Sequence, residues 1–600
     1  MRFPSPPPRA RFFVRCLICQ PIRPLFVVYG AGSQSPCRDA YLEFGYCWRS
    51  SMPLRCLSPS KMRLVPASRR VSKHITIAGS RTYSFNHTRT INMATAHKIK
   101  VPVTNTGLWK FKQQDSSADM VSELLQKDLE KHHVFFNNDG FHNHIPHHLL
   151  ALYGTGAGPE AIQMGYKENE NYQRPAKNSH DGVADELHDW EKAKKYLGRE
   201  RHYPDFLLFY QREIERLGGW QEALNEHLFK GDERADDMFQ RMFAGFLHPI
   251  IQLMYGVEWE QPAILAEGLA QAAVHKNELK PFFEETERRA REGGAPMPRI
   301  AELVEEVRGN EKLVGAVRMG DRNKVFDGVL VRAPEEMKDI ASKVRVSAEE
   351  LDERTVEMFH ACAWIAGCAA QKPGKEARWD FFLIHHLNSS PIFLSFNAAP
   401  WISTENKIRM LEHKIRLDLV QYAARGSPEL RIDAVRSYRP KDQDLKKPLV
   451  SKPTDLLSRF HKIPDDGHTI KVVRALGICQ ELSAKYAGRP WIKIKDDEDW
   501  LKLHYSVLDG TEHVEEKWVR TTGLDEAWKV SNLWTPLHGR LTNVRPDHTC
   551  AQLTSRWHES KTVREAWDEC SGWCGTSRMV KRGIHCYNIY SLFQPNPISI

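Results

Sequence analysis

Four histidines lie within seven residues at the start of the segment HNHIPHHLLALYGTGAGPE, residues 142–160. Imidazole titrates near neutral pH, so such a cluster can bind a metal, polarise a carbonyl or move protons. A single buried histidine is most often a structural hydrogen-bonding group, but four together favour a functional role for at least one. His144 and His148 are four residues apart and share one helical face, with His147 to the side and His142 in the preceding loop. His148 is therefore a candidate catalytic residue.

The glycines that follow raise the possibility of a dinucleotide-binding loop. Gly154 and Gly156 match the first two positions of that fingerprint, but Pro159 stands in place of the third glycine and no strand-like pattern precedes it. Pro146 and Pro159 instead suit the first turns of two helices, the first ending at Gly154. A Rossmann loop is disfavoured, and no flavin-binding motif is evident.

Two further apolar segments carry polar groups at helical spacing. In FLHPIIQLMYGVEWEQPAILAEGLAQAAVH, three polar residues share one helix face, Glu267 lies among apolar residues, and a histidine ends the next helix. A buried carboxylate is unfavourable unless it is paired, so we expect Glu267 to meet a histidine or an arginine. The segment WDFFLIHHLNSSPIFL adds another histidine. All these segments are expected to line one internal pocket. The candidate catalytic residues are His148, His248, His275, His385, Gln252 and Tyr255.

Metal binding is an alternative use of the histidines. Glu130-x-x-His133 and Glu357-x-x-His360 have the spacing of di-iron bundles, but glutamates suitably spaced on two further helices are lacking. Salt bridges and helix capping explain both pairs equally well, and we expect no metal at the catalytic site. A metal-dependent oxygenase or hydrolase stays open, as does a non-catalytic helical module that binds a metabolite or a partner protein.

The composition is that of a globular protein, with 41% hydrophobic and 27% charged residues, and no apolar run is long enough to span a bilayer. Of the net charge of +9, residues 1–92 contribute +13, from 13 Arg and 2 Lys against two acids, so the rest carries −4. Basic residues of the body are interleaved with acids in helical stretches. We therefore expect neither nucleic-acid nor membrane binding.

The chain divides into three parts. Residues 1–92 form a basic, irregular head that is either a transit peptide or a gene-model artefact, and residues 531–600 form an irregular tail. A body covering 93–530 starts at Met93 and would be cytoplasmic, whereas a genuine transit peptide would make the protein mitochondrial. The thiols of Cys362, Cys368 and Cys479 lie in apolar helical contexts and are expected to be buried and reduced. The oligomeric state is not predicted.

The body is predicted to be all-α, a multi-helix globular body with a buried His-rich pocket, flanked by the irregular end segments. SADMVSELLQKDLEKHHVFF follows a serine cap with apolar residues at three-to-four spacing, and SAEELDERTVEMFHACAWIAGCAAQ begins with a Ser-x-x-Glu capping box. TENKIRMLEHKIRLDLVQYAARG starts at a Thr cap and ends at Gly426. Strand-like alternation is scarce.

Several of these segments resemble the questin oxidase-like proteins of fungi, a family that includes a Baeyer–Villiger oxidase of the aflatoxin and sterigmatocystin pathway. The similar segments are HNHIPHHLLALYGTGAGPEAIQMGY, NYQRP, FLHPIIQLMYGVEWEQPAILAEGLAQAAVH, DFFLIHHLNSSPIFL and WVRTTGLDEAWK, in that order, spanning about residues 97–529. The resemblance implies an oxidoreductase that uses NADPH and molecular oxygen to insert oxygen beside a ring carbonyl of an anthraquinone-type polyketide in secondary metabolism.

Baeyer–Villiger enzymes usually form a flavin peroxide, which this sequence gives no motif to support. We therefore hypothesise that an electron-rich polycyclic phenol, reduced by NADPH, itself reacts with oxygen in a dry pocket. In this scheme His148 or His248 removes a phenolic proton. Gln252 and Tyr255 donate hydrogen bonds to the developing oxyanion.

Overall fold

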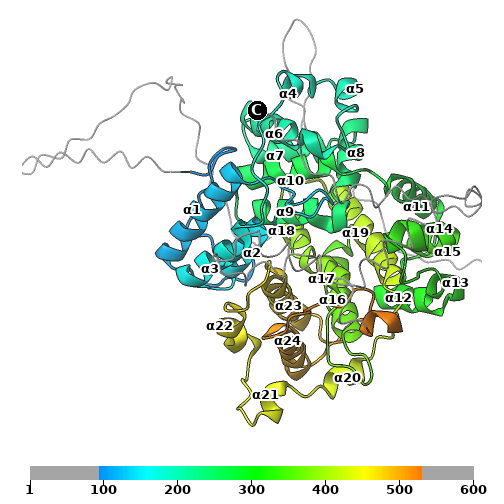
Figure 1. Ribbon diagram of the computed structural model, residues 1–600. Helices are drawn as coiled ribbons and strands as arrows, with labels where there is room; N and C mark the ends of the chain where they lie inside the picture. Colours follow the sequence, from blue (N-terminus) through cyan, green and yellow to red (C-terminus); the bar gives the residue numbers. More distant parts are fainter. Residues whose placement is uncertain (1–92, 530–600) are drawn as a thin grey trace, which may run out of the picture. The chain divides into compact units, whose positions relative to one another are not determined.

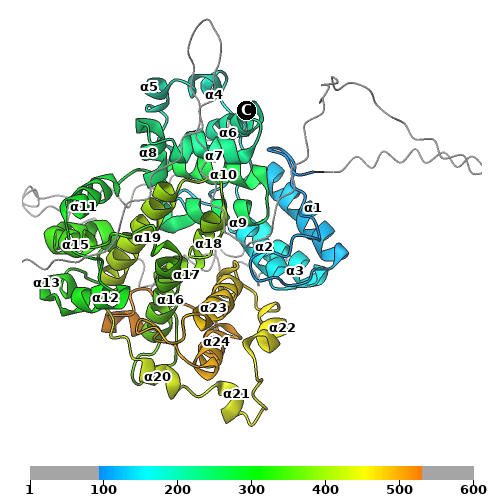
Figure 2. The same cartoon turned by 180° about the vertical axis from the view of Figure 1, so that it is seen from behind.

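The computed structural model describes residues 93–529, so the predicted head (1–92) and tail (531–600) lie outside the described residues. The described part is built from helices joined by loops, and its only β-type pairing consists of three isolated bridges. Figures 1 and 2 show these helices from opposite sides. The prediction of an all-α body is confirmed.

The first half of the described chain contains α1 (Asp115–Lys131), α2 (Ile145–Gly154), α3 (Pro159–Glu170), α4 (Val183–Glu186), α5 (Trp190–Ala193), α6 (Tyr203–Arg216), α7 (Trp220–Leu224), α8 (Glu233–Arg241), α9 (His248–Glu258), α10 (Pro262–Val274), α11 (Lys280–Glu292), α12 (Ile300–Gly309) and α13 (Glu311–Val314). The second half contains α14 (Leu330–Arg332), α15 (Pro334–Ala341), α16 (Leu351–Ala369), α17 (Phe381–Asn388), α18 (Ile392–Ala398), α19 (Thr404–Ala424), α20 (Ile432–Arg436), α21 (Lys441–Asp444), α22 (Leu457–Phe460), α23 (His468–Ala484) and α24 (Asp497–Thr511). Short 3₁₀ segments are Glu200–His202, Gly245–Leu247, Pro453–Leu456 and Asp525–Trp528, and π-helical segments are Asn225–Phe229 and Lys324–Val329.

The glycine-rich turn at 154–158 joins two helices, as predicted. α2 has a proline in its first turn and ends at Gly154, and α3 begins at Pro159. A dinucleotide loop needs a strand before it and a helix after it, and this turn has a helix on both sides.

Some helix caps differ from the predicted ones. Ser403, not Thr404, caps α19, with its hydroxyl accepting from the Asn406 N–H at 3.2 Å. α16 begins at Leu351, four positions beyond Ser347, and has no side-chain cap. Ser117 lies inside α1 because its hydroxyl donates instead to the Ala157 carbonyl, 3.0 Å away. Tertiary hydrogen bonds thus replace local capping at α1.

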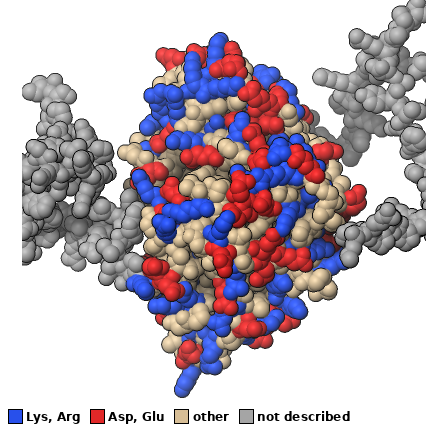
Figure 3. Space-filling view, turned by 90° about the vertical axis from the view of Figure 1, so that its right-hand side faces the viewer, with Lys and Arg blue, Asp and Glu red and all other residues tan. Residues whose placement is uncertain are grey.

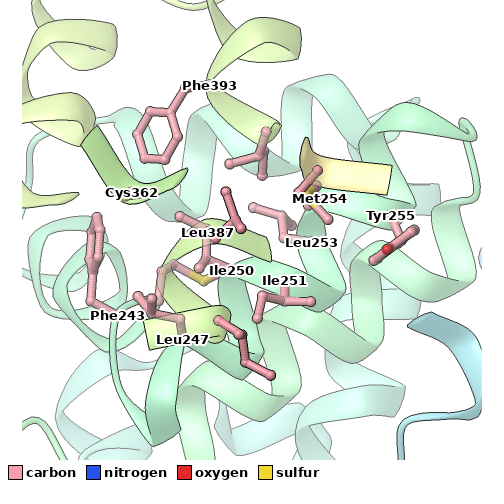
Figure 4. Close-up of a cluster of buried hydrophobic side chains, with 14 of the residues drawn as sticks. Phe243, Leu247, Ile250, Ile251, Leu253, Met254, Tyr255, Cys362, Leu387 and Phe393 are labelled. Atoms are coloured by element: carbon pink, nitrogen blue, oxygen red, sulfur yellow. The ribbon is translucent and has the colours of Figure 1, made fainter. Parts of the chain in front are cut away.

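The core is centred on α9 and α10, which pack against each other and are buried along their whole length. A helix that is apolar on all sides is stable only inside a protein. α6 packs on α10, and α2 and α18 pack on α9. Figure 4 shows apolar side chains of α9 meeting Leu387 of α17 and Phe393 of α18. Polar groups on these two central helices are therefore held away from bulk water.

Residues of both pairs with di-iron spacing have protein hydrogen-bond partners. Glu357 accepts from Arg299 at 3.0 Å and from Arg354 at 2.9 Å. His360 contacts the Ser483 hydroxyl at 2.9 Å through Nδ1 and accepts the Lys493 N–H at 2.9 Å.

His133, from the other pair, lies 3.3 Å from the Arg174 guanidinium, which disfavours a cation there. The cysteine prediction is confirmed, since Cys362, Cys368 and Cys479 are free and buried.

Charged side chains of both signs are spread among uncharged ones on the face of the described part drawn in Figure 3. Figure 3 shows one face on which Lys and Arg alternate with Asp and Glu, without a broad patch of either sign. Among the described residues, no helix combines the length and apolar character needed to cross a membrane.

Candidate active site

Histidines from five helical segments meet where α2, α9, α17 and α23 pack together and α10 ends. Three pairs form with their Nε2 atoms facing each other. His142 and His275 are 2.8 Å apart, and His144 and His248 are also 2.8 Å apart. His385 and His468 form a longer contact of 3.2 Å. As predicted, these separated segments bring His248, His275 and His385 together.

The first two pairs are also linked by ring stacking. The rings of His142 and His248 are parallel within 2°, with centroids 3.9 Å apart. The ring of His144 lies 5.0 Å from that of His248, also nearly parallel. Contact at these distances allows one histidine to sense the protonation of the next.

A single carboxylate joins two of the pairs. Asp466, in the loop before α23, accepts from Nδ1 of His144 at 3.0 Å and from Nδ1 of His468. Burial raises the pKa of Asp466, but its two histidine partners outweigh burial and hold that pKa well below its ordinary range. An ionised carboxylate only accepts hydrogen bonds, so both histidines present Nδ1–H to it. Their Nε2 atoms consequently face His248 and His385.

A strained loop positions the start of α9. Gly245, Phe246 and Leu247 have φ values of 55°, 56° and 68°, in the left-handed region. The Gly245 carbonyl accepts from Nδ1 of His248 at 2.7 Å. A Cβ at Gly245 would lie 2.4 Å from Nε2 of His275, so glycine leaves room for that ring. Strain of this kind persists only where the surrounding structure enforces it, and it concentrates at functional sites.

Burial disfavours the charged forms of His275, His248 and His385. It is the main cause that lowers the pKa of His275 to about 4 and the pKa of His248 and His385 well below the ordinary value. Burial likewise lowers the pKa of Lys471, on α23, to about 8. Neutral imidazoles can accept a proton from a bound acid such as a phenol.

A cavity of about 400 Å³ reaches this cluster. That volume lies within the range of roughly 300–1,000 Å³ usual for small-molecule pockets. Its walls include His142, His275 and His386 together with the rings of Phe135, Phe243, Phe246 and Phe326. A larger hollow of about 570 Å³ beside Trp401 has no histidine in its lining. The smaller cavity is therefore the candidate substrate site.

Gln252 belongs to a separate buried chain beside the cluster. Its Oε1 lies 2.5 Å from Nε2 of His147, and its amide donates to Glu267 at 2.8 Å. The expectation that Glu267 meets a histidine or an arginine is wrong. Burial raises the pKa of Glu267 to about 8, so the carboxyl is uncharged at neutral pH and needs no cation.

Tyr255 and His148 also lie outside the cavity lining. Tyr255 stacks on His147 with ring centroids 5.6 Å apart. His148 lies 3.5 Å from the Asn169 amide, and a Cβ at Gly467 would come within 2.6 Å of it. Of the six residues predicted from the sequence, the structure thus brings together His248, His275 and His385, with His275 on the cavity wall.

Sequence reasoning missed Asp466, His468 and Lys471. The signal lay in PDDGHTIKVV, where two acids and a glycine precede a histidine at a helix start. His142 was noticed but not chosen, although it lines the cavity.

Of the two groups of described residues that could hold a metal ion, one lies in this site. Ligand atoms of His144, Asp466 and His468 lie within 4.8 Å of one another. Two imidazoles and a carboxylate are a common donor set for zinc or non-haem iron. The same atoms are also satisfied by their mutual hydrogen bonds.

Comparison with known proteins identifies relatives across the described region. The family model for questin oxidase-like proteins matches residues 141–476. The Baeyer–Villiger oxidase ptaJ of Pestalotiopsis fici is 35% identical over 449 residues, which cover 73% of this chain and 99% of that protein. The questin oxidase of Aspergillus fumigatus is 33% identical, covering 73% and 99%. The oxidoreductase AflY of Aspergillus parasiticus is 33% identical, covering 76% and 89%. The chain therefore belongs to the questin oxidase-like family.

Proposed function

We propose that the protein is a Baeyer–Villiger-type oxidase that inserts one oxygen atom beside a ring carbonyl of an anthraquinone or a related aromatic polyketide. The observation that carries the proposal is the cavity of about 400 Å³, with aromatic walls and uncharged histidines at its surface. Aromatic rings suit a flat polycyclic substrate, and the histidines supply acid–base groups. Relatives named Baeyer–Villiger oxidase and questin oxidase support this reaction class.

The overall reaction consumes one ketone, one O₂, one NADPH and one proton. It gives one lactone or ester, one NADP⁺ and one water, so NADPH supplies the two electrons that reduce the second oxygen atom. Once the quinone has been reduced by NADPH, a histidine within the cavity takes the proton from a phenol of the reduced substrate, and the electron-rich ring then reacts with oxygen. The resulting substrate peroxide attacks the neighbouring carbonyl, and a protonated histidine returns the proton to the departing oxygen.

His142 and His275 both line the cavity and share a 2.8 Å contact, so this pair is placed to return the proton to the departing oxygen. His248 stacks on His142 and connects the pair to Asp466 through His144. Gln252 bonds His147 and Glu267 and does not line the cavity, so it is not placed to donate to a substrate oxyanion.

The test mixes the purified full-length protein with NADPH, oxygen and a panel of hydroxyanthraquinones and follows product mass. A gain of one oxygen atom that requires both the quinone and NADPH would support the proposal. Quinone turnover without NADPH would refute the role of NADPH as the reductant. No NADPH consumption with any quinone, in a protein that binds them, would favour a metabolite-binding module instead.

A second function, a metal-dependent oxygenase, is favoured by the ligand set of His144, Asp466 and His468. Elemental analysis of the purified protein separates the two. Stoichiometric iron or zinc, with activity lost on chelation and restored by that metal, would support the metalloenzyme. Full activity in metal-free protein would exclude it.

A further inference from the structure

A histidine–aspartate pair from α17 and α19 also reaches the cavity wall. His386 lines the cavity, and its Nδ1 lies 2.5 Å from Oδ1 of Asp418. The same carboxylate oxygen accepts from Lys414 at 2.5 Å. Leu417 and Gln421, on the same helix as Asp418, line the cavity as well. The histidine–aspartate pair is therefore built into the wall of the candidate substrate site.

The hydrogen-bond partners of Asp418 are buried. Lys414 is fully buried, and its ammonium also contacts the sulfur of Cys362 at 3.4 Å. Burial alone would lower the pKa of Lys414, but Asp418 outweighs it and raises that pKa. Burial would raise the pKa of Asp418, and Lys414 and His386 lower it below the ordinary range. The carboxylate is thus ionised, and its charge is balanced by Lys414.

This arrangement sets the tautomer of His386. Because an ionised carboxylate only accepts, Nδ1 of His386 carries the proton and Nε2 carries the lone pair. Nδ1 is directed at Asp418, so the opposite edge of the ring, with Nε2, is the edge available to the cavity. Among the described residues, Nε2 of His386 has no hydrogen-bond partner.

The His142–His275 pair differs in one respect that matters for chemistry. Each of those rings faces another imidazole through Nε2. His386 instead has a carboxylate behind it, which stabilises the imidazolium formed when Nε2 takes a proton and opposes burial, Lys414 and Arg425, which together lower the pKa of His386. A carboxylate-backed imidazole is the stronger base of the two arrangements.

We propose that His386 is the catalytic base that removes the phenolic proton of the substrate, and that Asp418 is the positioning residue that orients it. The proposal rests on the proposed function for the identity of the substrate. The phenol O–H bond breaks, its proton bonds to Nε2 of His386, and the electron pair stays on the phenolate oxygen. The imidazolium is then paired with Asp418, and the phenolate is paired with the imidazolium.

The test uses the full-length protein and 2-hydroxyanthraquinone, whose phenolate absorbs at longer wavelength than its phenol. Absorption spectra across a pH series give the pH at which the bound probe ionises, independently of turnover. The variants are His386→Asn, which removes the base, and the double variant Asp418→Asn with Lys414→Met, which removes the carboxylate without leaving a buried lysine unpaired. His504→Asn is the matched control, since His504 is also buried but does not line the cavity.

The wild type and His504→Asn are expected to ionise the bound probe at a lower pH than free probe. In His386→Asn the bound probe should ionise at a pH at least one unit higher, roughly a tenfold weaker stabilisation of the phenolate. The double variant should fall in between, and kcat/KM should decrease in the same order by roughly 10²-fold or more for His386→Asn. The Kd of the probe, measured below its ionisation pH, should stay near that of the wild type.

Wild-type ionisation behaviour in both variants would overturn the proposal, as would failure of the wild type to bind the probe. A wild type that ionises the probe through His386 but never oxidises a quinone would refute the oxidase and leave the base assignment standing. Oxidase activity that is unchanged in His386→Asn would refute the base assignment and leave the oxidase function standing.

Discussion

Glu267 gives the protein a specific dependence of stability on pH. Burial raises its pKa from an ordinary value near 4.5 to about 8, with the charge of Asp128 adding to the effect. The folded protein therefore keeps a proton that the unfolded chain has released between these pH values. Stability from this group is fully present below pH 4.5 and is lost progressively as the pH rises to about 8.

The size of this change in unfolding free energy follows from the shift in the pKa of Glu267. Each pH unit within that window removes about 1.4 kcal/mol of unfolding free energy, so the whole window is worth on the order of 4 to 5 kcal/mol. The substitution Glu267→Gln keeps an oxygen that can accept from the Gln252 amide, and it cannot ionise. The E267Q variant should therefore lose this slope and become more stable than the wild type toward pH 8.

Urea unfolding of both proteins at several values between about pH 5.5 and 7.5 measures the slope. The Glu357→Gln variant is the matched control, because it breaks ion pairs with Arg299 and Arg354. It should lose about 3–5 kcal/mol at each of these pH values, as removal of one partner of a buried ion pair does. Equal pH slopes in E267Q and the wild type would refute the assignment of a buried, protonated Glu267.

Three further predictions concern the site and its support. His275→Asn should lower kcat/KM by roughly 10²-fold or more. Wild-type activity should show no loss from protonation of His275 until the pH approaches about 4, the lowered pKa of that residue. A pH–rate profile of both proteins checks both expectations. Gly245→Ala should destabilise the protein by about 2 kcal/mol or more, because φ is +55° and the new Cβ would meet His275, and thermal unfolding would show a lowered Tm. Glu258→Gln breaks the buried pair with Arg474 and should cost about 3–5 kcal/mol in urea unfolding, and a loss below 1 kcal/mol would contradict it.

The helices were predictable because their signals are local. The prolines in the first turns of α2 and α3 and the apolar spacing of α19 are signals that lie within one or two turns. The cap of α1 was not predictable in this way. Ser117 donates to a carbonyl 40 positions away, and no local pattern contains that partner.

The site was predictable in kind and only partly in detail. Histidines and a carboxyl in otherwise apolar helices signal polar groups that need buried partners. The partners themselves come from packing: His144 meets His248 at a separation of 104 positions and Asp466 at 322. Those contacts arise because α2 packs on both α9 and α23, which a single sequence does not reveal. Asp466 was missed for this reason, although its side chain connects two of the three histidine pairs.

The arrangement also explains how an apolar core accommodates so many titratable groups. Burial lowers the pKa of His248 and His275 and raises that of Glu267, so in both cases burial favours the uncharged form at neutral pH. The charge that remains on Asp466 is shared between two N–H donors. Few full charges therefore lack a partner within the histidine cluster, and this end of the cavity can exclude water. A dry cavity with neutral, hydrogen-bonded imidazoles is the environment in which a phenolate and a peroxide react with a carbonyl before water intervenes.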